Sequence, residues 1–115
     1  MAPGKRRTML VRELARTREF LLSAEWLAWA MRQSTEIHDR AAMLLMAVEV
    51  ARLALLDAEL ATIRDELAVN DPALAAGVEA LAIARDSLAR FAGALDIVAD
   101  LLTIIARIVH IRPMP

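Results

Sequence analysis

The clearest alternation of apolar and polar positions runs from Pro72 to Arg112. Polar positions recur there at steps of three or four residues, which places them on one face of an α-helix. They are Asp86, Arg90, Gly93, Asp96, Asp100, Thr103, Arg107 and His110. Almost every other position from 88 to 111 is apolar. A helix this apolar needs partners around most of its circumference, so the pattern predicts a helical bundle.

Two earlier segments show the same periodicity. The first predicts a helix from about Thr8 to about Arg32, with one apolar seam that steps by three and four residues. Gln33-Ser34-Thr35 is the weakest boundary in the chain, because it contains neither Gly nor Pro. Ser34 or Thr35 would serve as the N-cap of a second helix, so we expect a turn here rather than one continuous helix.

The second segment predicts a helix from about Glu36 to Val69 that carries two adjacent apolar seams. One seam comprises Ala42, Met46, Glu49, Leu53, Leu56, Leu60, Ile63 and Leu67. The other comprises Ile37, Ala41, Leu44, Val48, Ala51 and Leu55. Two seams on one helix imply contact with more than one partner helix.

The third predicted helix follows a strong turn signal. Asp71 suits an N-cap position and Pro72 suits the first turn of a helix, so the preceding helix must end by Asn70. Pro113-Met114-Pro115 would stop this helix. The expected fold is therefore all-α, an up-down bundle of three long helices within a single domain, residues 8–112.

Opposite charges support an antiparallel hairpin of the second and third helices about this turn. Residues that face one another across such a hairpin have numbers that sum to about 141. The oppositely charged pairs that meet this condition are Arg64–Glu79, Asp57–Arg85, Glu49–Arg90 and Arg52–Asp86. Each exposed pair adds at most ~1 kcal/mol, so their value would lie in setting the register.

Composition narrows the function classes. The chain of 115 residues is 58% hydrophobic, has 3% aromatic residues and contains no Cys, which excludes disulfides, zinc-thiolate sites and thiol nucleophiles. Absent cysteines fit a cytoplasmic location. The stretch 91–109 approaches the hydropathy of a membrane span but carries Asp96, Asp100 and Arg107, and each charge at bilayer depth costs ~2.5–3.5 kcal/mol. A membrane-active helical protein that forms an oligomeric assembly stays as an alternative.

The apolar excess of the third helix predicts self-association, because a lone three-helix unit would leave part of that surface in water. A dimer would bury it as a larger bundle. The expected interface residues are Leu88, Phe91, Leu95, Val98, Leu101, Leu102, Ile105 and Ile108.

The N-terminal region is strongly basic. Residues 1–18 carry six basic residues against Glu13 alone, while the whole chain has a net charge of −1. We expect residues 1–7 to form a flexible basic arm. A contact with nucleic acid or anionic lipid would involve Lys5, Arg6, Arg7, Arg12 and Arg16. Interleaved aromatics and phosphate-cradling Gly-rich loops are absent from this region, so base readout has no support.

The two histidines raise the question of a metal or cofactor. In the predicted hairpin His38 begins the second helix and His110 ends the third, near Trp26 and Trp29, so the four side chains would share one end of the bundle. The histidines are about six residues out of register, or on the order of 9 Å. We therefore expect polar helix ends there, with no metal and no cofactor, and keep a metal-dependent bundle through His38 and His110 as an alternative.

The run from Arg32 to His38 has an Arg, a polar residue, four further residues and a His. This spacing resembles the active-site motif of the HEPN-family ribonucleases, which are small helical bundles and often dimers. The resemblance covers seven residues. It implies that Arg32 and His38 would act on an RNA backbone, which makes a small ribonuclease a further alternative.

The function that these patterns favour is non-enzymatic. We expect a helical scaffold or protein-interaction module that self-associates, with the basic residues near the N-terminus as an accessory contact. Neither a specific partner nor a substrate can be derived from the residues.

Overall fold

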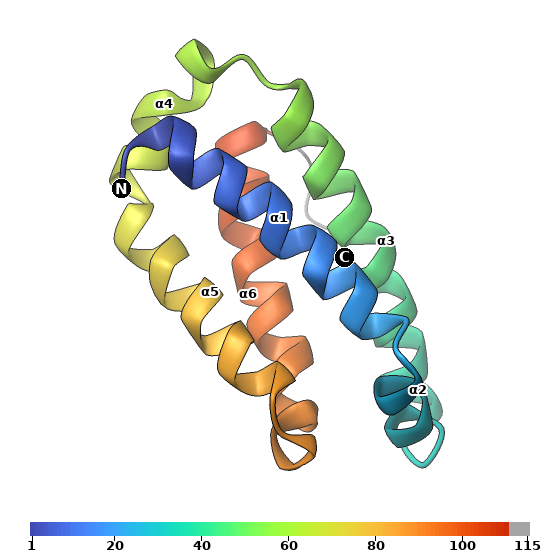
Figure 1. The fold of residues 1–115 in the computed structure, drawn as a ribbon. Helices are drawn as coiled ribbons and strands as arrows, with labels where there is room; N and C mark the ends of the chain where they lie inside the picture. Colours follow the sequence, from blue (N-terminus) through green and yellow to red (C-terminus); the bar gives the residue numbers. More distant parts are fainter. Residues whose placement is uncertain (111–115) are drawn as a thin grey trace.

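Helices make up nearly all of residues 1–110, the part of the chain that the computed structural model describes (Figure 1). The elements are α1 (Pro3–Leu21), α2 (Ala24–Ala30), α3 (Thr35–Asp57), α4 (Leu60–Val69), α5 (Asp71–Arg85), the 3₁₀ turn η1 (Leu88–Arg90) and α6 (Phe91–Val109). Residues 1–110 contain no strand, so the predicted all-α class is confirmed. The predicted ends at Arg112 and Pro113–Pro115 lie outside the described residues.

Each of the three long helices predicted from the sequence is broken once, so residues 1–110 form six helices in place of the three-helix up-down bundle. The first break follows Leu22, where the Ser23 hydroxyl accepts a hydrogen bond from the Trp26 amide (3.2 Å) and caps α2. The second lies at Ala58 and Glu59, and the third at residues 86–90. Neither Gly nor Pro marks any of these breaks, so the apolar periodicity runs through them unchanged.

The predicted boundaries at Ser34 and Asn70 are confirmed. Ser34 is the N-cap of α3, and its hydroxyl accepts a hydrogen bond from the Ile37 amide (3.4 Å). Helix α4 ends at Val69, and α5 begins at Asp71 with Pro72 in its first turn. Asp71 is the first helical residue, while Asn70 takes the cap position and its side chain makes no capping hydrogen bond.

The helices around this turn do not form the predicted antiparallel hairpin. Helices α4 and α5 meet at an angle of 78°. Helix α3 packs on α1 and α6, while α5 packs mainly on α6. The four predicted charge pairs are therefore absent among residues 1–110, and Arg85 instead pairs with Glu13 of α1.

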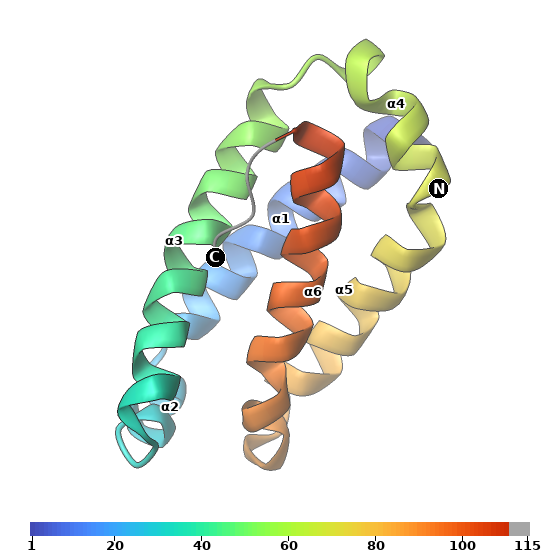
Figure 2. The ribbon, with the colours of Figure 1, turned by 180° about the vertical axis from the view of Figure 1, so that it is seen from behind.

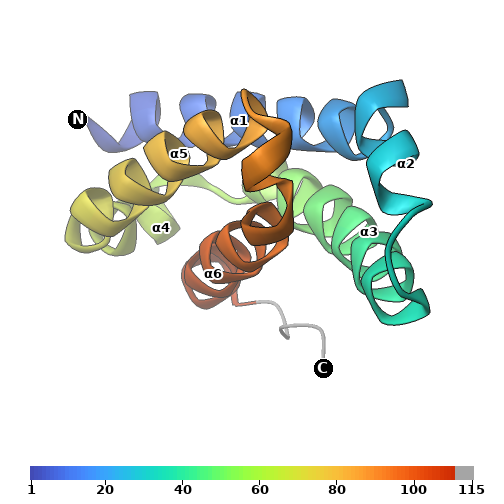
Figure 3. The same cartoon turned by 90° about the horizontal axis from the view of Figure 1, so that it is seen from below.

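Helices α3 and α6 lie next to each other and run in the same direction (Figures 1 and 2). Arg40, near the start of α3, pairs with Asp96, near the start of α6 (2.7 Å). Helix α1 crosses one side of the molecule diagonally and covers α3, α4 and α5, as the view from below shows (Figure 3). Helix α3 occupies one edge of the fold, opposite α5.

Residues 3–7, expected to belong to a flexible basic arm, are helical in the structure. Pro3 occupies the first turn of α1, where its missing amide hydrogen costs nothing. Two contacts hold this turn against the body of the protein. Arg6 pairs with Asp71 at the start of α5 (2.7 Å), and Arg7 donates to the Ala58 carbonyl at the end of α3 (2.7 Å).

The apolar side chains form two clusters. The larger one joins α1, α3, α4, α5 and α6, and Leu10, Leu55, Leu67 and Ile105 in it are completely buried. The smaller one gathers all four aromatic residues of the chain at the α2 end of the fold. Its ring centroids lie 5.0–6.0 Å apart in tilted and edge-to-face pairs among Phe20, Trp26, Trp29 and Phe91.

Candidate functional site

The polar face predicted for the third helix lies in solvent. All eight of its residues, from Asp86 to His110, are exposed. The opposite face of α6 is the most buried helical surface of the molecule, with nine of its nineteen residues buried. Helix α6 therefore shows the ordinary division between an apolar inner face and a polar outer face.

The predicted interface residues mostly belong to the inner face of α6. Seven of the eight are buried inside the single chain, and only Leu88 is exposed, with 54% of its surface accessible. The interface prediction assumed that a single chain leaves this side of α6 in water. That assumption was wrong, because α3 and α5 already cover it. A second copy cannot reach these side chains without opening the core.

Helix α3 departs from the division seen in α6. Its inner seam is in the core, where Val48, Ala51 and Leu55 are buried. Its outer surface is apolar too, but none of the helices within residues 1–110 lies against it. We call this surface the α3 apolar stripe. It consists of Met43, Met46, Val50, Leu53 and Leu56, which are 39–64% exposed.

The stripe continues over most of α3. Successive members are three, four, three and three residues apart, so each adjoins the next along the outer side of the helix, with Leu56 displaced around the helix from the first four. From Met43 to Leu56 the line is about 20 Å long. Single exposed apolar residues are normal on proteins, whereas a contiguous group of five large ones is a candidate binding surface.

Ion pairs flank the stripe on both sides. On the α1 side, Glu49 accepts hydrogen bonds from Arg52 (3.0 and 3.2 Å) and pairs with Arg18 (3.3 Å). The hydrogen bonds from Arg52 hold the pKa of the Glu49 carboxyl below its ordinary range, and they raise the pKa of the Arg52 guanidinium. On the α6 side lies the pair Arg40–Asp96. The apolar line thus has a charged rim on both sides, as protein interfaces commonly do.

The apolar periodicity of the sequence included part of this surface, but that part was not predicted to be the interface. Met46, Leu53 and Leu56 belong to the outer of the two predicted seams, and both seams were expected to meet partner helices. The structure supplies a partner for the inner seam only. Met43 and Val50 lay in neither predicted seam.

The basic residues near the N-terminus divide into two groups. Arg6 is buried in its pair with Asp71, and Arg7 is engaged with the Ala58 carbonyl. The exposed members of the predicted anionic contact are Lys5, Arg12 and Arg16.

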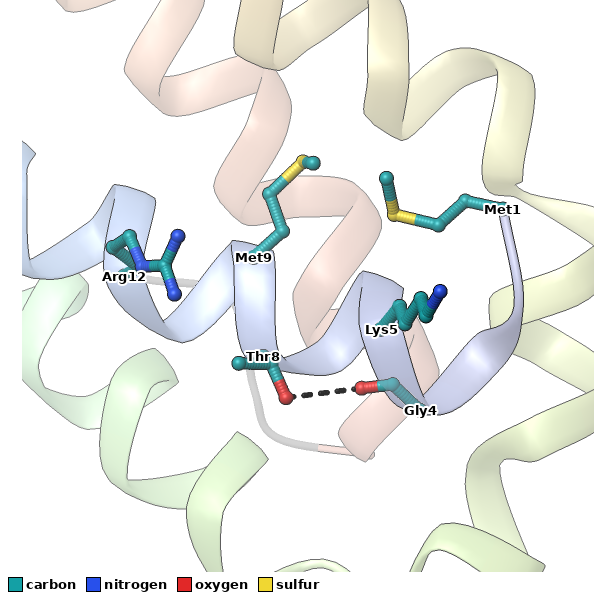
Figure 4. Close-up of a pocket in the computed structure, with 6 residues that line it drawn as sticks. All are labelled: Met1, Gly4, Lys5, Thr8, Met9 and Arg12. Carbon is teal, nitrogen blue, oxygen red and sulfur yellow. Dashed lines mark hydrogen bonds between the residues drawn. The ribbon is translucent and has the colours of Figure 1, made fainter.

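Two shallow depressions lie beside these exposed cations. One of about 390 Å³ is lined by Met1, Gly4, Lys5, Thr8, Met9 and Arg12 (Figure 4). The Thr8 hydroxyl there donates to the Gly4 carbonyl (3.1 Å), so it is already used within the helix. The other, about 420 Å³, lies between α1 and α5, where Glu13 and Glu79 line it together with Arg12, Arg16 and Arg85. In this second depression the two acids offset part of the positive charge, whereas the first is lined by Lys5 and Arg12 without an acid.

The structure does not bring His38 and His110 together. Because α3 and α6 are parallel, His38 at the start of α3 and His110 at the end of α6 lie at opposite ends of the molecule (Figure 2). His110 has a φ of 56°, in the left-handed region, and terminates α6. Trp26 is in the core, away from His110. Within residues 1–110, no group of three His, Asp or Glu side chains is placed to hold a metal ion.

The residues of the ribonuclease-like motif lie at the α2–α3 turn. Arg32 and His38 are both exposed, and the Arg32 Nε donates to the Ala28 carbonyl (3.4 Å). The His38 backbone amide donates to the Ser34 carbonyl in the first turn of α3 (3.2 Å). The motif therefore sits on a surface turn, with its arginine bonded to the preceding helix.

No single helix within residues 1–110 is long and apolar enough to cross a membrane. Helices α4 and α5 meet the length and composition requirements only as a pair, with the 78° bend between them.

Comparisons with protein-family models, with curated proteins and with solved structures found no match to this chain.

Proposed function

We propose that the protein is a non-enzymatic helical interaction module that self-associates, and that its binding surface is the α3 apolar stripe. The observation that carries this proposal is the contrast between the two parallel helices. The outer face of α6 presents Asp96, Asp100 and Thr103 to solvent, whereas the outer face of α3 presents methionine, valine and leucine. A partner that covers this stripe removes apolar surface from water, which stabilises the complex by about 25 cal/mol for each Å² buried.

The composition of the stripe suits binding. Two of its five members are methionines, whose flexible thioether side chains adapt to the shape of a partner. The charges along its two sides, Glu49 with Arg18 and Arg52 and Arg40 with Asp96, are already paired, so a partner that covers the apolar line would not strand these ions. A helix is the expected type of partner, because steps of three and four residues present knobs for packing against a second helix.

Sedimentation velocity and light scattering over a range of protein concentrations test this proposal. Val50→Glu places a charge in the middle of the stripe without touching the core, and Thr103→Glu is the matched control on the polar face of α6. We expect the wild type and the control to associate as concentration rises and Val50→Glu to remain monomeric. A wild type that stays monomeric at millimolar concentration, or a Val50→Glu variant that associates as the wild type does, would contradict the proposal.

Vesicle flotation separates self-association from the membrane-active alternative. We expect the wild type to stay with the soluble fraction in the presence of vesicles rich in phosphatidylserine. Flotation that Val50→Glu abolishes would instead assign the α3 apolar stripe to lipid.

A further inference from the structure

We propose that the partner of the α3 apolar stripe is a second copy of this chain, and that the two α3 helices pack antiparallel about a twofold axis between Met46 and Val50. This inference rests on the proposed function, and it adds the direction and register of the two copies. The spacing of the stripe, the sizes of its side chains and the charges at its ends support it.

The spacing of the central residues is the same in both directions. Met43, Met46, Val50 and Leu53 are separated by three, four and three residues. A twofold axis at the centre of this series places Met43 opposite Leu53 of the second copy and Met46 opposite Val50. The surface then complements itself, which is the requirement for a closed two-subunit interface.

Side-chain sizes favour the antiparallel direction over the parallel one. Antiparallel packing puts the longer Met46 against the smaller Val50 in both central layers. It also brings the exposed Ala42 close to Leu56 of the second copy. Parallel packing would put Met46 against Met46 and Val50 against Val50, which gives one crowded layer and one underfilled layer. Interfaces pack to the density of protein interiors, so layers of even size are favoured.

The ends of the stripe point to the same arrangement. Asp39 and Arg40 precede it, and Asp57 follows it. In the antiparallel dimer Asp57 of each copy lies opposite Asp39 and beside Arg40 of the other, so an arginine adjoins each facing pair of acids. A parallel dimer would bring the two Asp57 carboxylates together at the end of α3 that lacks Arg40. Antiparallel helices also align their macrodipoles favourably.

The size of the contact sets the expected strength. A line about 20 Å long between two helices is shorter than interfaces of the standard size, which bury ~800 Å² per partner. We therefore expect a dimer that dissociates in the micromolar range or above. Cross-linking is suited to such a complex because it accumulates the associated form.

The absence of cysteine from the chain allows a direct test. Met43→Cys and Leu53→Cys are prepared separately, one with a mass tag, and treated with a short bis-maleimide alone and as a mixture. Antiparallel packing predicts that the mixed 43–53 product forms at least several-fold faster than either homodimer. In that arrangement two copies of residue 43 lie about 15 Å apart along the helix. Circular dichroism checks that each variant is folded, and Thr103→Cys on α6 gives the background rate.

The other outcomes separate the failure of this inference from the failure of the proposed function. Fast 43–43 and 53–53 homodimers with little mixed product would mean parallel α3 helices, which overturns the antiparallel inference and leaves the α3 apolar stripe as the binding surface. Cross-linking at the Thr103→Cys background for every combination would overturn both. The result expected here is that the mixed product forms at least several-fold faster than either homodimer, at protein concentrations where light scattering detects association.

Discussion

Arg6 in the first turn of α1 donates from its Nε to Asp71 Oδ1 at the start of α5, at a distance of 2.7 Å. The two residues are 65 positions apart, and the arginine side chain is only 5% exposed. The pair therefore fastens the N-terminal end of α1 to the α4–α5 turn. It also explains why a residue assigned from sequence to a flexible basic arm belongs to the folded body.

The Arg6–Asp71 pair predicts a pH dependence of stability. Hydrogen bonding from Arg6, aided by the N-terminal ammonium of Met1, lowers the pKa of the Asp71 carboxyl below its ordinary value of 3.8. A carboxyl group with a lowered folded-state pKa contributes stability above its ordinary pKa, and the contribution is lost as pH falls through the lowered value. We expect Asp71→Asn to unfold at lower urea than the wild type near pH 7 and to approach the wild type as pH falls below 3.8 and through the lowered pKa.

The exposed carboxylate of Asp65 in α4 supplies the control for this experiment. Asp65→Asn should leave the urea midpoint close to that of the wild type at both pH values. A constant difference between Asp71→Asn and the wild type across the acid range would show that the carboxylate charge is not what Arg6 requires.

The pair of Glu13 on α1 and Arg85 on α5 is the most buried ion pair of the described residues, with side chains 5% and 15% exposed. Arg85→Met would leave the Glu13 carboxylate with only the exposed Arg16 guanidinium, 3.8 Å away. We expect a loss of about 3 kcal/mol in the free energy of unfolding. The double variant Glu13→Leu, Arg85→Met should recover most of that loss, because two apolar side chains of similar size replace the pair. Chemical denaturation of the four proteins measures the cycle, and additive effects would contradict it.

Two helical glycines differ in what surrounds them. A methyl group added at Gly77 of α5 would lie 3.1 Å from Leu101 Cδ1 on α6, whereas one added at Gly93 of α6 meets nothing within 4 Å. Gly93→Ala should therefore raise the free energy of unfolding by about 0.5–1 kcal/mol. Gly77→Ala should gain less or become destabilising, because Leu101 is buried and must shift. Equal gains at the two sites in urea denaturation would contradict the close approach of α5 and α6.

Sequence periodicity predicted the class of the fold and two of its boundaries for clear physical reasons. Ser34 offers a hydroxyl to the first amides of α3. Pro72 has no amide hydrogen and suits only the first turn of a helix, so α4 ends before it and α5 begins beside it. The prediction of an exposed polar face on α6 was also correct, because Asp and Arg side chains are rarely buried whichever helix packs nearby.

The arrangement of the helices could not be read in the same way. At the break at Ala58, the Ala58 carbonyl accepts a hydrogen bond from Arg7, which is 51 residues away in the sequence. The direction of α3 relative to α6 follows from the breaks at residues 58–59 and 86–90, which reorient the chain where the apolar pattern is continuous. Because unbroken helices were assumed, Glu49 was predicted to pair with Arg90 across a hairpin. In the structure the partners of Glu49 are Arg18 and Arg52.

The candidate site could not be located from apolar periodicity either. Apolar residues of α3 and α6 follow helical steps equally well, and periodicity does not tell which set has a partner within the chain. The prediction assigned the interface to residues such as Leu101 and Ile105, which the structure buries between α6 and its neighbours. The exposed set is on α3, where Met46 and Val50 face solvent.

A pair of charge substitutions tests this reassignment without any knowledge of the partner. Ile105 is completely buried, and Ile105→Glu would place a carboxylate in the core without a counter-charge. We expect a loss of more than about 4 kcal/mol, which is comparable with the whole stability of a small domain, so the helical signal in circular dichroism should collapse. Val50→Glu adds the same charge at a position 53% exposed, and we expect its free energy of unfolding to stay within about 0.5 kcal/mol of the wild type. If α6 were instead the contact between copies, Ile105→Glu would give a folded monomer and Val50→Glu would leave association unchanged.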